Sequence, residues 1–452
     1  MVMKHVFGLC IWTVVIVCLF TGMGQAAVND VGDASAKQLL FQAVRLGSEL
    51  TPPGAQIDLY RTIAGELAAM GEMSEAVQLS RTFDVKRGRD DVLLWAVQGA
   101  LRENRTEQAI ETTKLIEGEY EHDSSLSEIS LFHAETRNFT AAVAIISTMA
   151  SGSSATYTLS LVVPFMVRAG HLSEAIDAAL GLGDNHSKAQ VISSIVAEQF
   201  KLGDTGAARK TATEFTGKIH NQWPILALSK SQAHAGMIAE AKETASLLNE
   251  QLHFFALGHI AEALAKSGEV SQALNLASSI PSPSHRYEDS PTTRYSTIRQ
   301  IVQIQAQHGD YTSALSTALK IPSTMSACDI CESLRGEAIV EIGKAQAERG
   351  DYDQAMRTAE RLKKSTAYYG DEVIKSVATA YARQGQIEKA LKTSKRFRSR
   401  DYRAGTYRYI AEEWVKQGDS KKVLNWASSL PSKIEKAYAL VGIARGTRAL
   451  SQ

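Results

Sequence analysis

One short pattern recurs along most of the chain and constrains its fold more than any other feature of the 452 residues. It is a glycine followed five residues later by an alanine, as in Gly309 and Ala314 or Gly350 and Ala355. Successive copies start about 33 residues apart, and the eleven leading positions are Gly71, Asn104, Arg137, Gly170, Gly203, Gly236, Gly268, Gly309, Gly350, Gly385 and Gly418. Self-similarity at such a period is typical of repeat proteins. The pattern predicts a repeat array over residues 58–431.

Each repeat has the features of two helices joined by a tight turn. Apolar residues precede the leading glycine at spacings of three and four, such as Leu257, Ile260 and Leu264 before Gly268, and these spacings place one apolar face on a helix. Glycine ends such a helix because it adopts the left-handed cap conformation without steric cost. A short second helix follows, and its alanine allows the two helices to approach closely. We therefore expect an all-α protein.

The turn sequence Gly-Asp-Tyr-x-x-Ala, read at residues 309–314 and 350–355, resembles that of the tetratricopeptide repeat. The chain departs from that family in its mostly missing late proline, its short second helices and two repeats of 41 residues. The resemblance implies a right-handed α-solenoid of about eleven helix-turn-helix (TPR-like) repeats. It also implies a concave face that binds a partner peptide, on which Arg299, Lys375 and Arg408 would clamp a carboxylate.

The two ends of the chain differ from the repeats. Residues 1–27 combine Lys4, an apolar run over residues 6–20 and small residues near Ala26, as a secretory signal peptide does. An uncleaved membrane anchor is the alternative. Residues 28–57 predict an N-terminal capping helix and linker, and residues 432–452 a C-terminal capping helix, one at each end of an open rod. The expected location is the periplasm or the outside of the cell.

Two cysteines remain after such a signal peptide, and they stand close together as Cys328 and Cys331. An exported protein meets an oxidising compartment, which favours a local disulfide between them. Unpaired thiols and redox or metal chemistry are the alternatives, although zinc would need four ligands.

The two repeats of 41 residues are consecutive, and each carries about eight extra residues after its second helix. The first insertion contains His285, Arg286 and Tyr287, and the second contains the two cysteines. Insertions in repeat proteins often lie on the binding face, whereas the alternative is a tolerated surface loop. We therefore take these three residues as partner-binding candidates.

Charge is distributed unevenly although the chain has 49 basic and 49 acidic residues. Residues 361–408 contain thirteen Lys/Arg and four Asp/Glu, and the candidates on this segment include Lys395, Arg396, Arg398 and Arg400. For an exported protein this basic end of the rod favours an acidic partner protein or an anionic envelope component, and makes nucleic acid unlikely. The alternative is a solvated face balanced by acidic neighbours.

The sequence contains no HExxH motif, no glycine-rich phosphate loop and no GxSxG elbow. We therefore expect no enzyme activity, no cofactor and no metal, and interpret the chain as an exported protein–protein interaction scaffold or assembly factor. Two alternatives remain open. The chain could be a superhelical domain associated with cell-wall (peptidoglycan) enzymes, or a self-associating envelope protein that forms homo-oligomers.

Overall fold

The computed structural model describes residues 35–50, 53–281, 291–323, 331–362 and 367–451. These residues form helices and connecting turns, and no strand occurs among them. None of the helices in these ranges has the length and apolar character needed to cross a membrane. The fold is the helical-repeat solenoid that the repeat pattern predicts.

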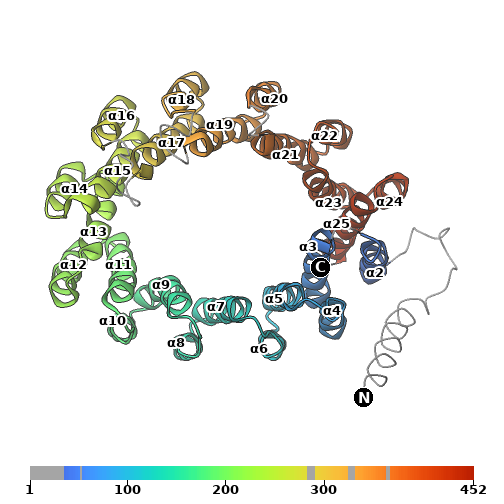
Figure 1. Ribbon diagram of the computed structural model, residues 1–452, viewed down its shortest axis with the longest axis horizontal. Coiled ribbons are helices and arrows are strands. Elements are labelled where there is room, and N and C mark those ends of the chain that lie inside the picture. The colour runs from blue at the N-terminus through green and yellow to red at the C-terminus, as the bar shows by residue number, and fades with distance from the viewer. Residues whose placement is uncertain (1–34, 51–52, 282–290, 324–330, 363–366, 452) are drawn as a thin grey trace, which may run out of the picture.

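The helices form two concentric layers, and Figure 1 shows the longer helices on the inside and the shorter ones on the outside. The inner helices are α3 (Pro53–Ala69), α5 (Lys86–Arg102), α7 (Glu119–Glu135), α9 (Gly152–Arg168), α11 (Asn185–Lys201), α13 (Trp223–His234), α15 (Glu250–Lys266), α17 (Pro291–Gln307), α19 (Cys331–Glu348), α21 (Ala367–Arg383), α23 (Arg400–Lys416) and α25 (Lys433–Ser451). The outer helices are α2 (Ala36–Gly47), α4 (Met73–Ser80), α6 (Thr106–Thr113), α8 (Phe139–Ile146), α10 (Leu172–Leu180), α12 (Thr205–Ile219), α14 (Ile238–Ala245), α16 (Val270–Ser279), α18 (Tyr311–Ala318), α20 (Tyr352–Arg361), α22 (Ile387–Ser394) and α24 (Ser420–Ser429). The pairs from α3–α4 to α23–α24 are the eleven repeats.

The residues that define the repeat act as the pattern predicts. All eleven leading positions have a positive φ, including the two that are not glycine, Asn104 at 58° and Arg137 at 62°. The residue five positions later is fully buried in every repeat, even where Val423 replaces alanine. The alanines therefore lie in the contact between the two layers, where a small side chain lets the helices approach.

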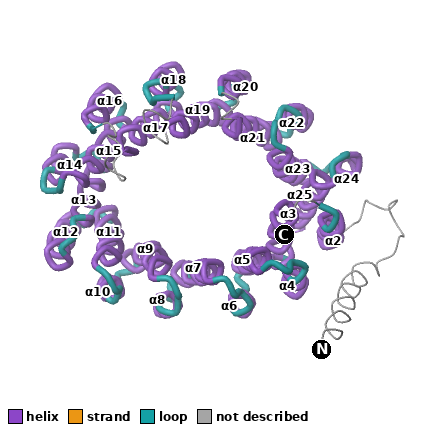
Figure 2. Tube along the Cα trace, in the orientation of Figure 1, coloured by secondary structure: helices purple, strands orange, loops and turns teal. Residues whose placement is uncertain are grey.

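The solenoid closes into a ring, which differs from the expected open rod (Figure 2). The terminal helices α2 and α25 pack against each other instead of covering two separate ends. Leu39 and Leu40 of α2 join Leu440 and Val441 of α25 in one buried apolar cluster. The two helices thus form a twelfth hairpin from opposite ends of the chain. We call their contact, together with that of α25 and α3, the seam.

The helix α2 occupies the place of a second helix in this twelfth hairpin. Ser35 caps it through a reciprocal pair of hydrogen bonds with Gln38, which is the capping-box arrangement. Ala43, eight residues after the cap, is fully buried, as are Ala179 and Ala318 at the equivalent positions of α10 and α18. Lys37 also forms ion pairs of 2.7 Å with Glu72 and Glu75, which tie α2 to the next outer helix, α4. Because the ring has no free end, the described part of the basic segment, residues 361–408, forms part of the ring wall instead of the end of a rod.

Candidate binding surface at the seam of the ring

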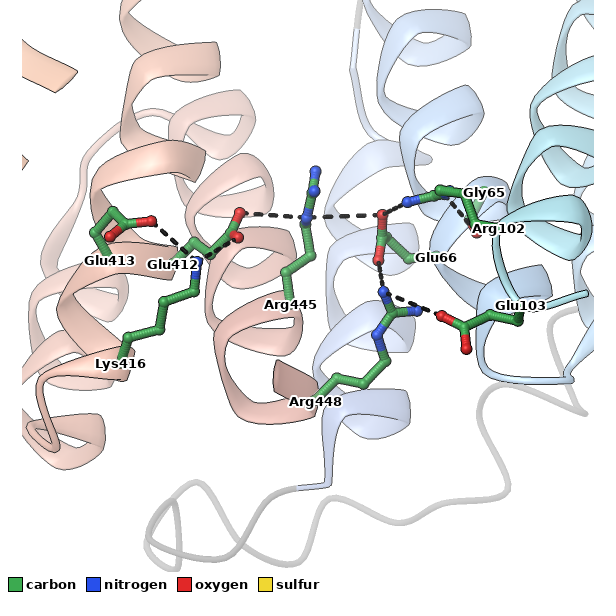
Figure 3. Close-up of polar contacts among 9 residues, drawn as sticks. All are labelled: Gly65, Glu66, Arg102, Glu103, Glu412, Glu413, Lys416, Arg445 and Arg448. Carbon is green, nitrogen blue, oxygen red and sulfur yellow. Dashed lines mark hydrogen bonds and ion pairs between the residues drawn. The ribbon is translucent and has the colours of Figure 1, made fainter. Parts of the chain in front are cut away.

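A buried carboxylate, that of Glu66 on α3, lies at the seam and is surrounded by arginines (Figure 3). Arg102 of α5 approaches it at 3.3 Å, and two arginines of α25 reach it across the seam, Arg445 at 3.7 Å and Arg448 at 3.6 Å. Glu66 thereby joins helices from the two ends of the chain. Removing one partner from such a buried charged group costs about 3–5 kcal/mol, so this contact should resist opening of the seam.

The charged network continues on both sides of Glu66. Arg445 also lies 3.2 Å from Glu412 of α23, and Lys416 contacts that same glutamate at 2.9 Å. Arg448 lies 4.0 Å from Glu103, the residue that follows α5. Figure 3 shows the chain of contacts running from α23 through α25 to α3 and α5. The network fixes the relative positions of these four segments.

A pocket of about 380 Å³ opens beside this network. Five helices of the inner layer contribute to its wall, namely α3, α5, α7, α23 and α25, so it exists only while the ring is closed. Its lining residues are Glu66, Trp95, Gln98, Leu101, Arg102, Glu128, Leu131, Phe132, Glu135, Arg408 and Arg445. We call this the seam pocket. It combines apolar and aromatic surface with convergent charged groups, as ligand pockets commonly do.

Arg408 differs from the other two arginines of the seam pocket. Arg102 and Arg445 are engaged with Glu66, whereas the structure records no ion pair or hydrogen bond for the Arg408 guanidinium within the described ranges. Burial, and then the positive charge of Arg445, lowers the pKa of Arg408 from its ordinary value. A guanidinium presents a fork of donors that matches a carboxylate in two parallel hydrogen bonds. Arg408 can therefore take an anionic group that enters the pocket.

Among the described residues no carboxylate forms an ion pair with Arg408, although the charges of Glu412 and Glu66 act on it. Glu66 is held by three other arginines, and Glu128 accepts a hydrogen bond of 3.0 Å from Gln98. Trp95 and Phe132 supply flat apolar surface on the neighbouring helices α5 and α7. The arrangement suits a ligand with a carboxylate and an apolar or aromatic body.

The three residues that the family resemblance places in one clamp lie on different inner helices. Arg299 of α17 lies 3.6 Å from Glu337 of α19. Lys375 of α21 lies 4.0 Å from Glu372, and its ammonium lies 5.9 Å from the centre of the Tyr402 ring. Neither of them lines the seam pocket, which contains Arg408. The structure therefore gives each of the three its own neighbours instead of bringing them to one point.

The basic candidates at the end of α22 and the start of α23 have mixed roles. Arg396 forms an ion pair with Glu360. The backbone N–H groups of Arg398 and Ser399 donate to the buried Asp371 at 3.1 and 2.9 Å, which fixes the turn between the helices. The exposed side chains of Lys395, Arg398 and Arg400 have no ion pair recorded among the described residues. These cations lie together on one arc of the ring.

The loop candidates His285, Arg286 and Tyr287 lie outside the described residues, and so does Cys328. Cys331, the first residue of α19, is fully buried and disulfide-bonded. Every other cysteine of the chain lies outside the described ranges, so pairing with Cys328 stays a prediction.

Several residues of these surfaces carry no signal in the sequence. Glu66 and Trp95 belong to the first two repeats and Arg445 to the C-terminal helix α25, and only closure of the ring brings Arg445 to the other two. The sequence also predicts no metal site, yet His234, His259 and Glu262 place three ligand atoms within 4.8 Å of one another. Burial lowers the pKa of His259, and the neighbouring His234, His259 and Lys266 groups hold the pKa of Glu262 well below its usual range.

No protein-family model matches the chain, and no curated protein matches it. Solved structures resemble it over most of its length. The crystal structure of Ton1535 from Thermococcus onnurineus NA1 shares 14% identity at a TM-score of 0.23, covering 84% of this chain and 97% of that one. A chain of the Kap95:Nup1 complex shares 12% at a TM-score of 0.34, covering 97% of this chain and 65% of that one.

A circular tandem repeat protein with novel repeat topology and enhanced subunit contact surfaces shares 13% identity at a TM-score of 0.11, covering 92% of this chain and 73% of that one. Kap121p bound to Pho4p shares 12% at a TM-score of 0.27, and this chain covers 52% of its length. Likenesses at this level carry no conclusion about this chain. The helices themselves define the class of protein, an α-helical repeat solenoid closed into a ring.

Proposed function

We propose that the chain is an exported TPR-like scaffold that binds a protein partner through the inner wall of its ring, and acts by binding instead of catalysis. The observation that carries the proposal is Arg408, a half-buried guanidinium in the seam pocket without an ion pair among the described residues. A half-buried cation without an ion pair loses part of its hydration, so its presence favours an anionic ligand that pairs with it. Repeat solenoids commonly bind partners on such extended concave walls.

The seam pocket suits a segment of a protein better than a whole domain. Its volume of about 380 Å³ lies near the lower end of the usual range for ligand pockets, about 300–1,000 Å³. One or two side chains fill that space. We therefore propose that the ligand is a peptide segment that places a carboxylate on Arg408 and an aromatic or aliphatic side chain against Trp95 and Phe132.

Export is proposed from residues 1–27, which have the charge, apolar run and small residues of a signal peptide. Mass spectrometry of the N-terminus of the protein recovered from its native cell tests this. The expected N-terminus is Ala27 or Val28, the first residue left after cleavage. A chain that retains residues 1–26 would contradict cleavage.

Peptide binding at Arg408 is tested with a phage-displayed library of random dodecapeptides selected on the purified chain. Enriched peptides are synthesised with a fluorophore, and their binding is followed by fluorescence anisotropy. Arg408→Ala should weaken binding about 10- to 100-fold, since a hydrogen bond to a charged group contributes about 1.5–3 kcal/mol. Replacing the critical carboxylate of the peptide by an amide should weaken binding to the unaltered protein by a similar factor. The affinity of Arg408→Ala for the two peptides should be nearly the same.

Arg335→Ala is the matched control, because Arg335 is a half-buried arginine of the inner helix α19 outside the seam pocket. It should leave peptide affinity unchanged. If the selected peptides bind Arg408→Ala and the unaltered chain equally well, or if no peptide is enriched, the seam pocket is not the partner site.

A further inference from the structure

Three side chains with metal-binding atoms meet on the inner layer, on the far side of the ring from the seam (Figure 1). His234 is the last residue of α13, and His259 and Glu262 lie in the middle of α15. The imidazole Nε2 of His234 lies 3.7 Å from Glu262 Oε2, and His259 Nδ1 lies 3.8 Å from the same oxygen. One carboxylate oxygen thus faces two ring nitrogens.

The local structure explains why these three groups converge. His259 and Glu262 are three residues apart on one helix, and this spacing places two side chains on the same face. The helices α13 and α15 are neighbours in the inner layer and pack together, which brings His234 to that face. The cluster therefore depends on two regular helices, and these hold side chains more precisely than loops do.

The separations are close to those of a metal site but too long for hydrogen bonds. His259 Nδ1 is buried and has no hydrogen-bond partner among the described residues. A buried ring nitrogen without a partner loses its interaction with water and gains nothing in return. In a tetrahedral zinc site with bonds of about 2.0–2.2 Å, ligand atoms lie about 3.3–3.5 Å apart. Small side-chain rotations would bring the three atoms to that spacing around one cation.

A pocket of about 620 Å³ lies beside the cluster, and both His234 and His259 line it. Its other walls come from α11 and α13 and include Phe200, Trp223 and Lys230. Two imidazoles and one carboxylate leave a fourth tetrahedral position unfilled. Sites with three protein ligands keep that position for water or for a ligand. In this cluster the fourth position would face the pocket, which has space for water or a ligand.

Two lysines near the cluster act on it differently. Lys266 lies 2.6 Å from Glu262 Oε1, the oxygen that does not face the histidines, so Oε2 stays available to a cation. Lys230 lines the pocket, and its positive charge acts on His259. Lys230 therefore opposes a bound cation, and its removal should strengthen metal binding.

We propose that His234, His259 and Glu262 form a binding site for a divalent transition-metal ion, with zinc the best match to two nitrogens and one oxygen and with an open coordination position toward the pocket. Imidazole and carboxylate together suit zinc, and neutral imidazole also binds copper, nickel and cobalt. The site is independent of the seam pocket, which lies on other helices.

Zinc itself is the probe for this site. The untagged chain is stripped of metal with a chelator, and Zn²⁺ affinity is measured by competition with a fluorescent zinc indicator. The unaltered chain should bind one Zn²⁺ at this site. His234→Ala and Glu262→Gln should each weaken that binding by at least about 100-fold, since even outer partners of a metal site contribute 10- to 100-fold. Lys230→Ala should bind Zn²⁺ more tightly.

Co²⁺ provides a second readout, because its visible spectrum reports tetrahedral coordination, and the spectrum should be lost in His234→Ala. His308→Ala is the matched control, since His308 is an exposed histidine directly after the inner helix α17 and lies outside the cluster. His234 is exposed at a helix end, so its truncation leaves the fold intact, and circular dichroism checks this. Equal Zn²⁺ affinity in the unaltered chain, His234→Ala and Glu262→Gln, or no binding by the unaltered chain, would overturn the proposal.

Discussion

The residues that end the first helices of the repeats must adopt a left-handed backbone conformation, and glycine does so with the least strain. The glycines at these positions have φ between 75° and 92°. Asn104 and Arg137 take φ near 60°, the narrower left-handed region that other residues can enter at some cost. Several of these glycines, among them Gly268, have no atom of the described residues near the place of a Cβ. Glycine is therefore favoured at these positions by the backbone conformation, and not by a clash that a Cβ would cause.

Gly268→Ala should therefore destabilise the ring by about 1–2 kcal/mol, the usual cost of a left-handed conformation for a residue with a Cβ. Gly405→Ala is the matched control, because Gly405 lies inside α23 and a Cβ there would also meet no atom in the described part of the chain. There the alanine should stabilise the helix by about 0.5–1 kcal/mol. Urea unfolding followed by circular dichroism measures both. Midpoints that move in the same direction would contradict this account.

At the scale of helices, the contacts on the two sides of the seam are unusually close. A Cβ at Gly442 of α25 would lie 1.9 Å from the backbone oxygen of Arg408, and one at Gly99 would lie 2.1 Å from that of Gly65. These glycines let α25 pack backbone to backbone on α23, and α5 on α3. The same close packing sets the positions of Arg408, Arg102 and Glu66 around the seam pocket.

Gly442→Ala should push α25 away from α23 and cost at least about 1–3 kcal/mol, the usual penalty of overpacking. Because α25 also forms the seam with α2, hydrogen–deuterium exchange should rise in both terminal helices. Gly217→Ala in the outer helix α12 provides the comparison, because within the described ranges no atom lies near the added Cβ. Unchanged exchange in α2 would show that the seam does not depend on this contact.

At the scale of the whole molecule, the ring depends on contacts between residues from opposite ends of the chain. Lys433 and Glu49, 384 positions apart, form an ion pair across the seam. Leu40 of α2 is fully buried in the apolar cluster that joins α2 to α25. Each hairpin of the ring contacts only its neighbours, so the other hairpins cannot replace the contacts that are lost when the seam opens.

Leu40→Asp should open the ring, because it buries a carboxylate in the apolar contact between α2 and α25. Small-angle X-ray scattering should show a larger radius of gyration, and peptide binding at the seam pocket should weaken. Leu247→Asp introduces the same charge at a residue that is 64% exposed and should change neither quantity. A radius of gyration unchanged in Leu40→Asp would mean that other contacts hold the ring closed.

Local features of the sequence were sufficient to predict the repeats. The helix ends at the eleven leading positions, the buried alanines five residues later and the short outer helices all follow from interactions within about 20 residues, where spacing alone brings groups together. Arg408 was also predicted as a binding residue, through family resemblance. Its surroundings were not predicted, because Glu66, Trp95 and Arg102 come from the other end of the chain.

The sequence by itself therefore determined the unit of this protein, a helical hairpin with a left-handed turn and a small-residue contact. Tertiary structure decided that the hairpins form a closed ring and not a rod. The direction of each hairpin relative to the next depends on how whole helix surfaces pack, and small rotations accumulate along the array until its ends meet. The seam pocket and the cluster of His234, His259 and Glu262 belong to this level, since neighbouring helices must be placed before their side chains can converge.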